Sequence, residues 1–153
     1  MTFKLGPRSL QRLSGVHGDL ARVVHRAIEL TTVDFGVIEG LRTVERQTEL
    51  VRQGASKTMN SRHITGHAVD LAPFIAGQPR WDWPLFYPLA DAVKKASIEL
   101  RVPIVWGCVW DKRIAELGDM EKAVEGYVAR RKKAGFKAFV DGPHFELDRK
   151  VYP

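Results

Sequence analysis

The stretch that decides the fold is Ser61-Arg62-His63-Ile64-Thr65-Gly66-His67-Ala68-Val69-Asp70. Gly66 favours a turn in its middle, and the alternation of residues from Ala68 onward is typical of a strand. A helix would instead place His63 and His67 one turn apart as two metal ligands. The glutamate that follows the first histidine in the helical zinc-peptidase motif is absent, so we expect a turn followed by a strand.

The face on which Asp70 lies in this strand has a consequence for function. Ala68 and Ala72 share that face, while Val69 and Leu71 face the core. We therefore expect Asp70 to point into a cleft lined by small residues, which leaves room for a metal ion and a substrate.

A second stretch, Asp141-Gly142-Pro143-His144-Phe145-Glu146-Leu147, lies near the end of the chain. Gly142 and Pro143 predict a tight turn, and the residues from His144 onward predict a strand. His144 and Glu146 would share one face of this strand, with Phe145 and Leu147 on the other.

Together the two stretches supply a set of metal ligands. A catalytic zinc ion takes three protein ligands and keeps an open position for water, and His63, Asp70 and His144 match that set. Two neutral imidazoles and one carboxylate leave the site net positive, so bound water can ionise near neutral pH. Asp141 lies three residues before a ligand, where its carboxylate can take the proton of the water and pass it to the leaving amine. Zn²⁺ is the expected cofactor, although other divalent ions accept the same ligands.

Two further residues are candidates for the site. Arg42 is predicted at the junction between a strand over 34–40 and a helix capped by Thr43, and we expect it to stabilise the charge on the scissile carbonyl oxygen. The alternative is an ordinary surface arginine. Trp106 and Trp110 are either core aromatics or the wall of a substrate groove, and we assign Trp110 to substrate binding.

Apolar periodicity predicts the remaining elements. A helix follows Gly6-Pro7 and runs to about Leu30, with Gly15 and Gly18 as points of division. The other expected elements are a helix over 43–53, a loop over 74–80, a helix from 82 to about 100, and strands over 104–106 and 136–140.

The segment 111–137 is expected to be an inserted helix over or beside the cleft. Its apolar face would consist of Ile114, Leu117, Val124 and Val128. A chain of 153 residues fits one compact domain, so we expect residues 1–153 to form a single domain that includes this insertion.

Composition limits the class of partner. The chain has 24 basic and 18 acidic side chains, a net charge of +6 and one cysteine, Cys108, so any metal must be held by histidine and carboxylate. The charge suggests a polyanionic partner, such as anionic envelope polymers. The basic run 130–133 lacks the interleaved aromatics of single-strand binders, so we expect no nucleic acid partner. No targeting or membrane segment is visible, so we expect no membrane insertion and accumulation in the cytosol.

These residues resemble a family of zinc peptidases. The pattern from Ser61 through His63, Gly66 and Ala68 to Asp70, with the later Asp141 and His144, is similar to D-alanyl-D-alanine carboxypeptidases, dipeptidases and L-alanyl-D-glutamate endopeptidases. The stretches 40–47, 63–73 and 143–147 resemble the phage endolysin branch of the L-alanyl-D-glutamate peptidases. The resemblance extends from Phe3 to Leu147.

The resemblance implies an α+β fold with a small antiparallel sheet flanked by helices, shared with the hedgehog signalling domain. It implies the same zinc ligands, the same base and the same role for Arg42, and it adds Ser61 as a residue that orients the substrate. The family pattern Trp-Gly-Gly-x-Trp is Trp106-Gly107-Cys108-Val109-Trp110 here, so a side chain replaces a glycine. The segment 111–137 resembles the family only loosely.

The implied activity is hydrolysis of the L-Ala-D-Glu bond of peptidoglycan during host lysis. A monomeric enzyme would be stored in the host cytoplasm and would reach the periplasm and cell wall after release. The zinc motif alone is equally compatible with a D-alanyl-D-alanine carboxypeptidase, because both substrates carry a free carboxylate beside the scissile bond. A zinc-containing wall-binding module without hydrolysis is a further alternative, although a pure binder does not need Asp141.

Overall fold

The computed structural model describes residues 2–153 and shows an α+β fold. The strands form one antiparallel sheet in the order β1-β2-β5-β4, and β3 extends the far end of β2 as a hairpin. The helices are α1 (Pro7–Leu13), α2 (Gly18–Leu30), α3 (Val44–Arg52), α4 (Phe86–Leu100) and α5 (Met120–Lys133), with short 3₁₀ turns η1 (Trp83–Leu85) and η2 (Ile114–Glu116). The strands are β1 (Phe35–Glu39), β2 (Ala68–Ile75), β3 (Gln78–Pro79), β4 (Ile104–Trp106) and β5 (His144–Leu147).

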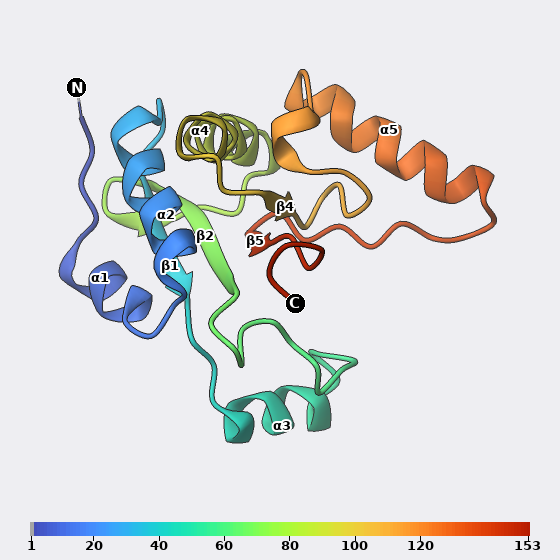
Figure 1. Ribbon diagram of the computed structural model, residues 1–153, viewed down its shortest axis with the longest axis horizontal. Coiled ribbons are helices and arrows are strands. Elements are labelled where there is room, and N and C mark those ends of the chain that lie inside the picture. The colour runs from blue at the N-terminus through green and yellow to red at the C-terminus, as the bar shows by residue number, and fades with distance from the viewer. Residues whose placement is uncertain (1) are drawn as a thin grey trace.

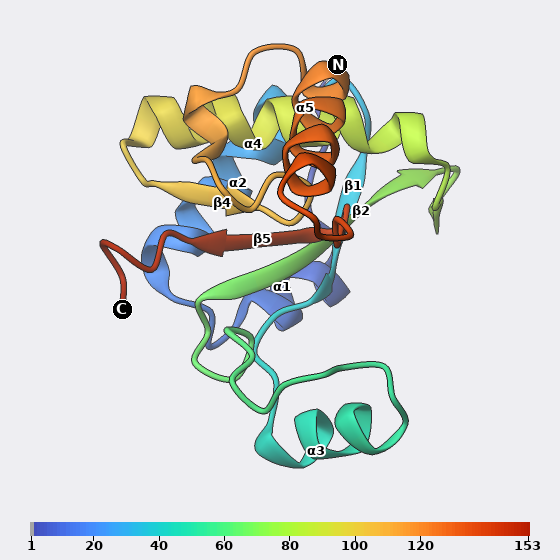
Figure 2. The same ribbon diagram turned by 90° about the vertical axis from the view of Figure 1, so that its right-hand side faces the viewer.

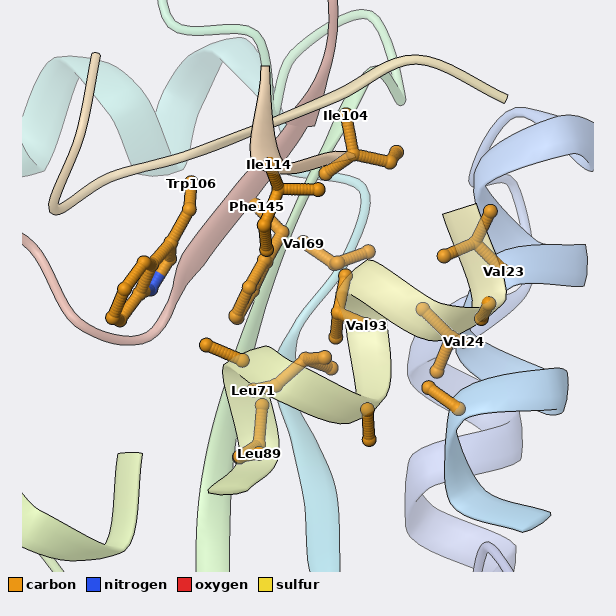
Figure 3. Packing of buried hydrophobic residues seen from close by; sticks show 14 of the residues in the cluster. Val23, Val24, Val69, Leu71, Leu89, Val93, Ile104, Trp106, Ile114 and Phe145 are labelled. Carbon is orange, nitrogen blue, oxygen red and sulfur yellow. The ribbon is translucent and has the colours of Figure 1, made fainter. Parts of the chain in front are cut away.

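Helices α2 and α4 pack together and cover one face of the sheet (Figures 1 and 2). The core between them contains Val69 and Leu71 from β2, Phe145 from β5, and Leu89 and Val93 from α4 (Figure 3). Helix α3 lies away from this core, beyond the end of the sheet. Among residues 2–153, no helix combines the length and hydropathy that crossing a membrane would require.

Residue alternation explains why β2 and β5 occupy the centre of the sheet. Val69 pairs directly with Phe145, and the Phe145 ring stacks on Trp106 of β4 with 6.2 Å between ring centroids. The neighbouring pair, Asp70 and His144, therefore points to the opposite face. The same register that builds the core thus brings two polar side chains together on the other side of the sheet.

Two turns contain residues with left-handed backbone angles, and one of them contradicts the prediction from sequence. The first predicted helix is divided, as Gly15 and Gly18 allowed, because Gly15 takes a left-handed φ of 87° between α1 and α2. The predicted loop over 74–80 is wrong. Strand β2 continues to Ile75 and turns back into β3 through Ala76 and Gly77, whose φ values of 53° and 78° are both left-handed.

The expected strand over 136–140 is also wrong. These residues are joined to no other strand, and Phe136 and Phe139 are exposed. Strand β5 already has β2 and β4 as its two neighbours, so the alternating apolar residues of this segment find no place beside it.

The segment 111–137 forms η2 and α5, and α5 packs beside α4. Asp119 caps α5 by accepting a hydrogen bond from the backbone N–H of Lys122. The buried face of α5 contains Val124 and Tyr127, whereas the predicted core residue Val128 is 41% exposed. Ile114, Leu117 and Val124 of the predicted apolar face are buried, so the prediction is wrong only at Val128, whose place in the buried face is taken by Tyr127.

The burial of Leu71 in the core allows a test of the fold. Leu71 has no exposed surface, so Leu71→Ala should lower the free energy of unfolding by about 2–5 kcal/mol in urea denaturation. Leu10→Ala is the matched control, because Leu10 is largely exposed and its truncation should cost less than about 1 kcal/mol. Equal losses from both variants would contradict the placement of the core.

Candidate active site

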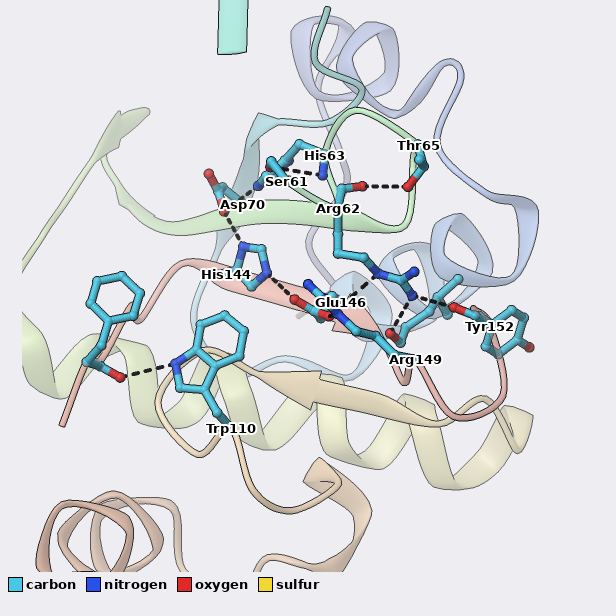
Figure 4. A network of polar contacts seen from close by, with 12 residues as sticks. Ser61, Arg62, His63, Thr65, Asp70, Trp110, His144, Glu146, Arg149 and Tyr152 are labelled. Atoms are coloured by element: carbon cyan, nitrogen blue, oxygen red, sulfur yellow. Dashed lines mark hydrogen bonds and ion pairs between the residues drawn. The ribbon is translucent and has the colours of Figure 1, made fainter. Parts of the chain in front are cut away.

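The pairing of β2 with β5 brings the three predicted metal ligands together. Asp70 and His144 are directly opposite each other in the sheet, and His63 lies in the turn that leads into β2. The Asp70 Oδ1 atom is 3.2 Å from His63 Nε2 and 3.4 Å from His144 Nδ1 (Figure 4). The ligand atoms of all three residues lie within 4.8 Å of one another.

Each histidine is oriented by a hydrogen bond on its other ring nitrogen. His63 Nδ1 is 3.0 Å from the Gly40 carbonyl oxygen, and His144 Nε2 is 2.9 Å from Glu146 Oε1. A carbonyl or carboxylate oxygen can only accept, so the ring protons lie on these nitrogens in the neutral tautomers. The lone pairs of His63 Nε2 and His144 Nδ1 then both face Asp70.

This arrangement fits a bound cation. Asp70 Oδ1 is buried and has no hydrogen-bond donor with adequate geometry, so an anionic oxygen and two ring lone pairs converge on one point. Outer partners that fix the tautomer, as Gly40 and Glu146 do here, are typical of histidines that bind metals.

When no metal is bound, a proton on His144 balances the negative charge of Asp70. Burial disfavours the charged form of His144, but the nearby carboxylates of Asp70 and Glu146 outweigh burial and raise the pKa of His144 to about 9. Burial also opposes ionisation of Asp70, yet the close approach of the His144 and His63 rings holds its pKa well below the usual range. A divalent cation would replace the proton held between His144 and Asp70, so metal binding should release a proton.

Asp141 lies beside this cluster without belonging to it. Its backbone N–H donates to the Gly107 carbonyl at 2.8 Å, and a Cβ on Gly107 would lie 2.4 Å from the Asp141 carbonyl oxygen. Only glycine therefore allows this close approach of the two loops. Burial, and then the charge of Asp70, raises the pKa of Asp141 above its ordinary value.

Arg42 is held rigidly at the edge of the cleft. Its Nε and Nη2 atoms donate to the Glu39 carboxylate at 2.7 and 2.6 Å, and Nη1 donates to Gln47 Oε1 at 2.7 Å and Ser61 Oγ at 3.3 Å. The sequence interpretation missed Glu39 and Gln47 as supports. The signal that could have identified Gln47 is an uncharged polar residue on the buried face of an otherwise amphipathic helix.

The two tryptophans have different surroundings. Trp106 is fully buried in the core, whereas Trp110 lines the cleft, 5.2 Å from the His144 ring between centroids. Trp110 Nε1 donates to the Phe139 carbonyl oxygen at 3.1 Å, and the two rings stack. Trp110 and Phe139 therefore form an aromatic wall next to a predicted ligand.

A cleft of about 760 Å³ unites these groups. All seven residues predicted for the site line it: Arg42, Ser61, His63, Asp70, Trp110, Asp141 and His144. The roles of these residues stay predictions.

Ala68 and Ala72 do not line the cleft, contrary to expectation, because both are fully buried in the central strand of the sheet. Helix α5 lies beside the cleft rather than over it, since no residue of 111–137 lines it.

Cys108 occupies the position of the second glycine in the resembled loop. Its φ is not left-handed, so the loop does not require glycine there. The side chain is fully buried against the core. Burial, and then the nearby charge of Asp141, raises the pKa of the Cys108 thiol to about 12.

The cluster predicts which histidine is needed for metal binding. His63→Ala should abolish tight binding of one Zn²⁺ per chain in calorimetry, together with the stabilisation that the metal provides. That stabilisation should reach about 2.7 kcal/mol at a free metal concentration one hundred times the Kd. His67→Ala is the matched control, since His67 lies outside the cluster and should leave both quantities unchanged. Loss of binding in His67→Ala alone would contradict the assigned ligand set.

The buried thiol predicts low chemical reactivity. A pKa of about 12 leaves only about one thiolate in ten thousand at pH 8, and the fraction rises only as pH approaches that value. A thiol reagent added at pH 8 should therefore label Cys108 only as fast as the chain unfolds. Rapid labelling of the folded chain would show that this loop opens.

Comparison with known proteins identifies the family. A family model described as phage L-alanyl-D-glutamate peptidase matches residues 1–148. The L-alanyl-D-glutamate peptidase of Escherichia phage T5 is 36% identical over 115 residues, covering 72% of this chain and 84% of that protein. The crystal structure of the Serratia marcescens L-Ala D-Glu endopeptidase ChiX has 36% sequence identity and a TM-score of 0.73, covering 98% of this chain and 94% of its own. The chain therefore belongs to the phage L-alanyl-D-glutamate peptidase family.

Proposed function

We propose that this chain hydrolyses the bond between L-alanine and D-glutamate in the peptidoglycan stem peptide, with the cleft residues in the roles predicted from the sequence. The observation that carries the proposal is the convergence of His63, Asp70 and His144 beside a carboxylate, Asp141, that is not needed as a ligand. The family to which the chain belongs has this activity in its description.

His63, Asp70 and His144 would hold the metal through Nε2, a carboxylate oxygen and Nδ1, and two imidazoles with one carboxylate favour Zn²⁺. When bound, the metal polarises the attacking water and the scissile carbonyl group. The Gly40 carbonyl and Glu146 keep the two imidazoles in the required tautomers. These contacts leave the ligand geometry largely formed in the folded chain.

Asp141 would act as the general base and then as the general acid. Its carboxylate accepts a proton from the attacking water as the new C–O bond forms at the L-alanine carbonyl carbon. It then gives that proton to the D-glutamate nitrogen as the C–N bond breaks. The raised pKa of Asp141 supports the first step, because such a carboxylate accepts a proton more readily than that of an ordinary aspartate.

Arg42 and Ser61 would bind the oxygens of the substrate. The contacts of Arg42 with Glu39 and Gln47 fix its guanidinium before substrate arrives, which is the condition under which a cation stabilises a developing oxyanion well. Ser61 Oγ lies beside the same guanidinium and would orient the peptide. Trp110 would contact an apolar part of the substrate.

We further propose that the reaction serves host lysis, as the phage family suggests. The enzyme would stay in the host cytoplasm until release and then act on the wall as a monomer. Its net charge of +6 would favour approach to anionic envelope polymers, and part of that charge is gathered in the last turn of α5, at 130–133.

Digestion of purified peptidoglycan with mass spectrometry of the products tests the function. The unmodified chain should generate new L-alanine carboxyl termini and D-glutamate amines, and a chelator should remove the activity. Asp141→Asn should lower kcat by about 10²–10⁴-fold while retaining the metal.

Asp91→Asn is the control, because Asp91 pairs with Lys95 on the exposed surface of α4 and should leave activity unchanged. Release of D-alanine alone would reassign the chain as a carboxypeptidase. Metal binding and wall binding without any hydrolysis would show a binding module instead.

A further inference from the structure

The charges that line the cleft balance one another, so a bound divalent cation would leave the cleft with an excess of positive charge. Four basic and four acidic side chains line it: Arg42, Lys57, Arg62, Arg149, Glu39, Asp70, Asp141 and Glu146. Arg42 pairs with Glu39, and Arg62 pairs with Glu146 at 3.6 Å. Asp70 and Asp141 would face the metal. Glu146 also pairs with Arg149 at 3.3 Å, so one carboxylate is shared by two guanidinium groups, and no ion pair of Lys57 is present among residues 2–153. With a divalent cation bound, the excess positive charge therefore lies around Lys57, Arg62 and Arg149.

Among the three arginines that line the cleft, Arg149 has the most accessible guanidinium. Arg42 is engaged through all three of its nitrogens. Arg62 is largely buried, and its Nη2 donates to the Leu147 and Tyr152 carbonyl oxygens. The Arg149 side chain is 64% exposed, and its hydrogen bonding within residues 2–153 is confined to Nε, which donates to Glu146 Oε2 at 3.3 Å. Both terminal nitrogens of Arg149 therefore remain able to bind a ligand.

The contact with Glu146 fixes where that ligand would lie. Glu146 uses one carboxylate oxygen for His144 and the other for Arg149, so it stands between the predicted metal ligand and the guanidinium (Figure 4). Lys57, in contrast, is an exposed point charge on the loop before Ser61. A guanidinium anchored at Nε presents a fixed pair of donors, which matches the two oxygens of a carboxylate.

We infer that Arg149 binds a free carboxylate of the stem peptide and selects substrates that carry it. This inference rests on the proposed function. D-Glutamate is linked onward through its side chain, so its α-carboxylate is free, and the third residue of the stem carries a second free carboxylate in some walls. Both sources present the same chemistry to the guanidinium. Arg149 is then a specificity-determining residue rather than a part of the bond-breaking machinery.

Four soluble stem peptides separate the two sources. They combine D-glutamate or its α-amide with a third residue that either has or lacks a second carboxyl group. Arg149→Gln should raise KM roughly tenfold for peptides that carry the recognised carboxylate, leave KM unchanged for peptides that lack it, and keep kcat within about twofold. Lys150→Gln makes the same charge change at an adjacent exposed residue that does not line the cleft, and should alter neither constant.

Peptide affinity, measured by calorimetry in the background of Asp141→Asn, makes the test independent of turnover. The inference would be supported if the affinity depends on the carboxylate and Arg149→Gln removes that dependence. This holds even if the unmodified chain cleaves no peptide, an outcome that would refute only the proposed function. Equal losses on all four peptides, with weaker zinc binding, would overturn the inference and assign Arg149 to positioning His144 through Glu146. Unchanged affinity for all four peptides would overturn it as well.

Discussion

The antiparallel pairing of β2 with β5 is the constraint on which the rest of the structure depends. It places Asp70 opposite His144, two residues far apart in the chain, at the separation that directly opposed strand residues always have. The adjacent pair, Val69 and Phe145, enters the core. Because side chains alternate between faces, one register builds the core and the site together, and a slip of one residue would destroy both.

Without a bound cation, the carboxylates and imidazole lone pairs of the site repel one another. Asp70 and Asp141 lie close enough for the charge of one to raise the pKa of the other, and the Asp70 oxygen faces two imidazoles. Such a cluster disfavours folding unless a proton or a cation occupies it, so a bound metal should contribute to stability as well as to chemistry. The paired charges of Arg42 and Glu39 show the other solution, in which each partly buried charge has its own partner.

Sequence patterns predicted the part of the site that depends on alternation. The period of two in both stretches placed His144 and Glu146 on one face and predicted the turns before them, as observed. The supports of Arg42 were missed because local sequence patterns do not tell that α3 directs Gln47 back toward the end of β1, where Arg42 lies. The segment 136–140 has the composition of a strand, yet composition does not tell whether a neighbouring strand is available to pair with it. The hairpin at Ala76 and Gly77 was missed because the left-handed φ of Ala76 is unusual for a residue with a side chain.

The sheet and the loops make different contributions to the site. The ligands of the predicted metal site are positioned by strand pairing and by backbone contacts such as that of His63 with Gly40. The walls of the cleft come instead from connections: Ser61 from the loop after α3, and Phe139 from the segment that follows α5. Phe139 reaches Trp110 only because α5 returns the chain to the cleft, so the inserted helix acts on the site through the loop it delivers. Changes in these connections can alter the shape of the cleft while the strand register keeps the geometry of the predicted metal site fixed.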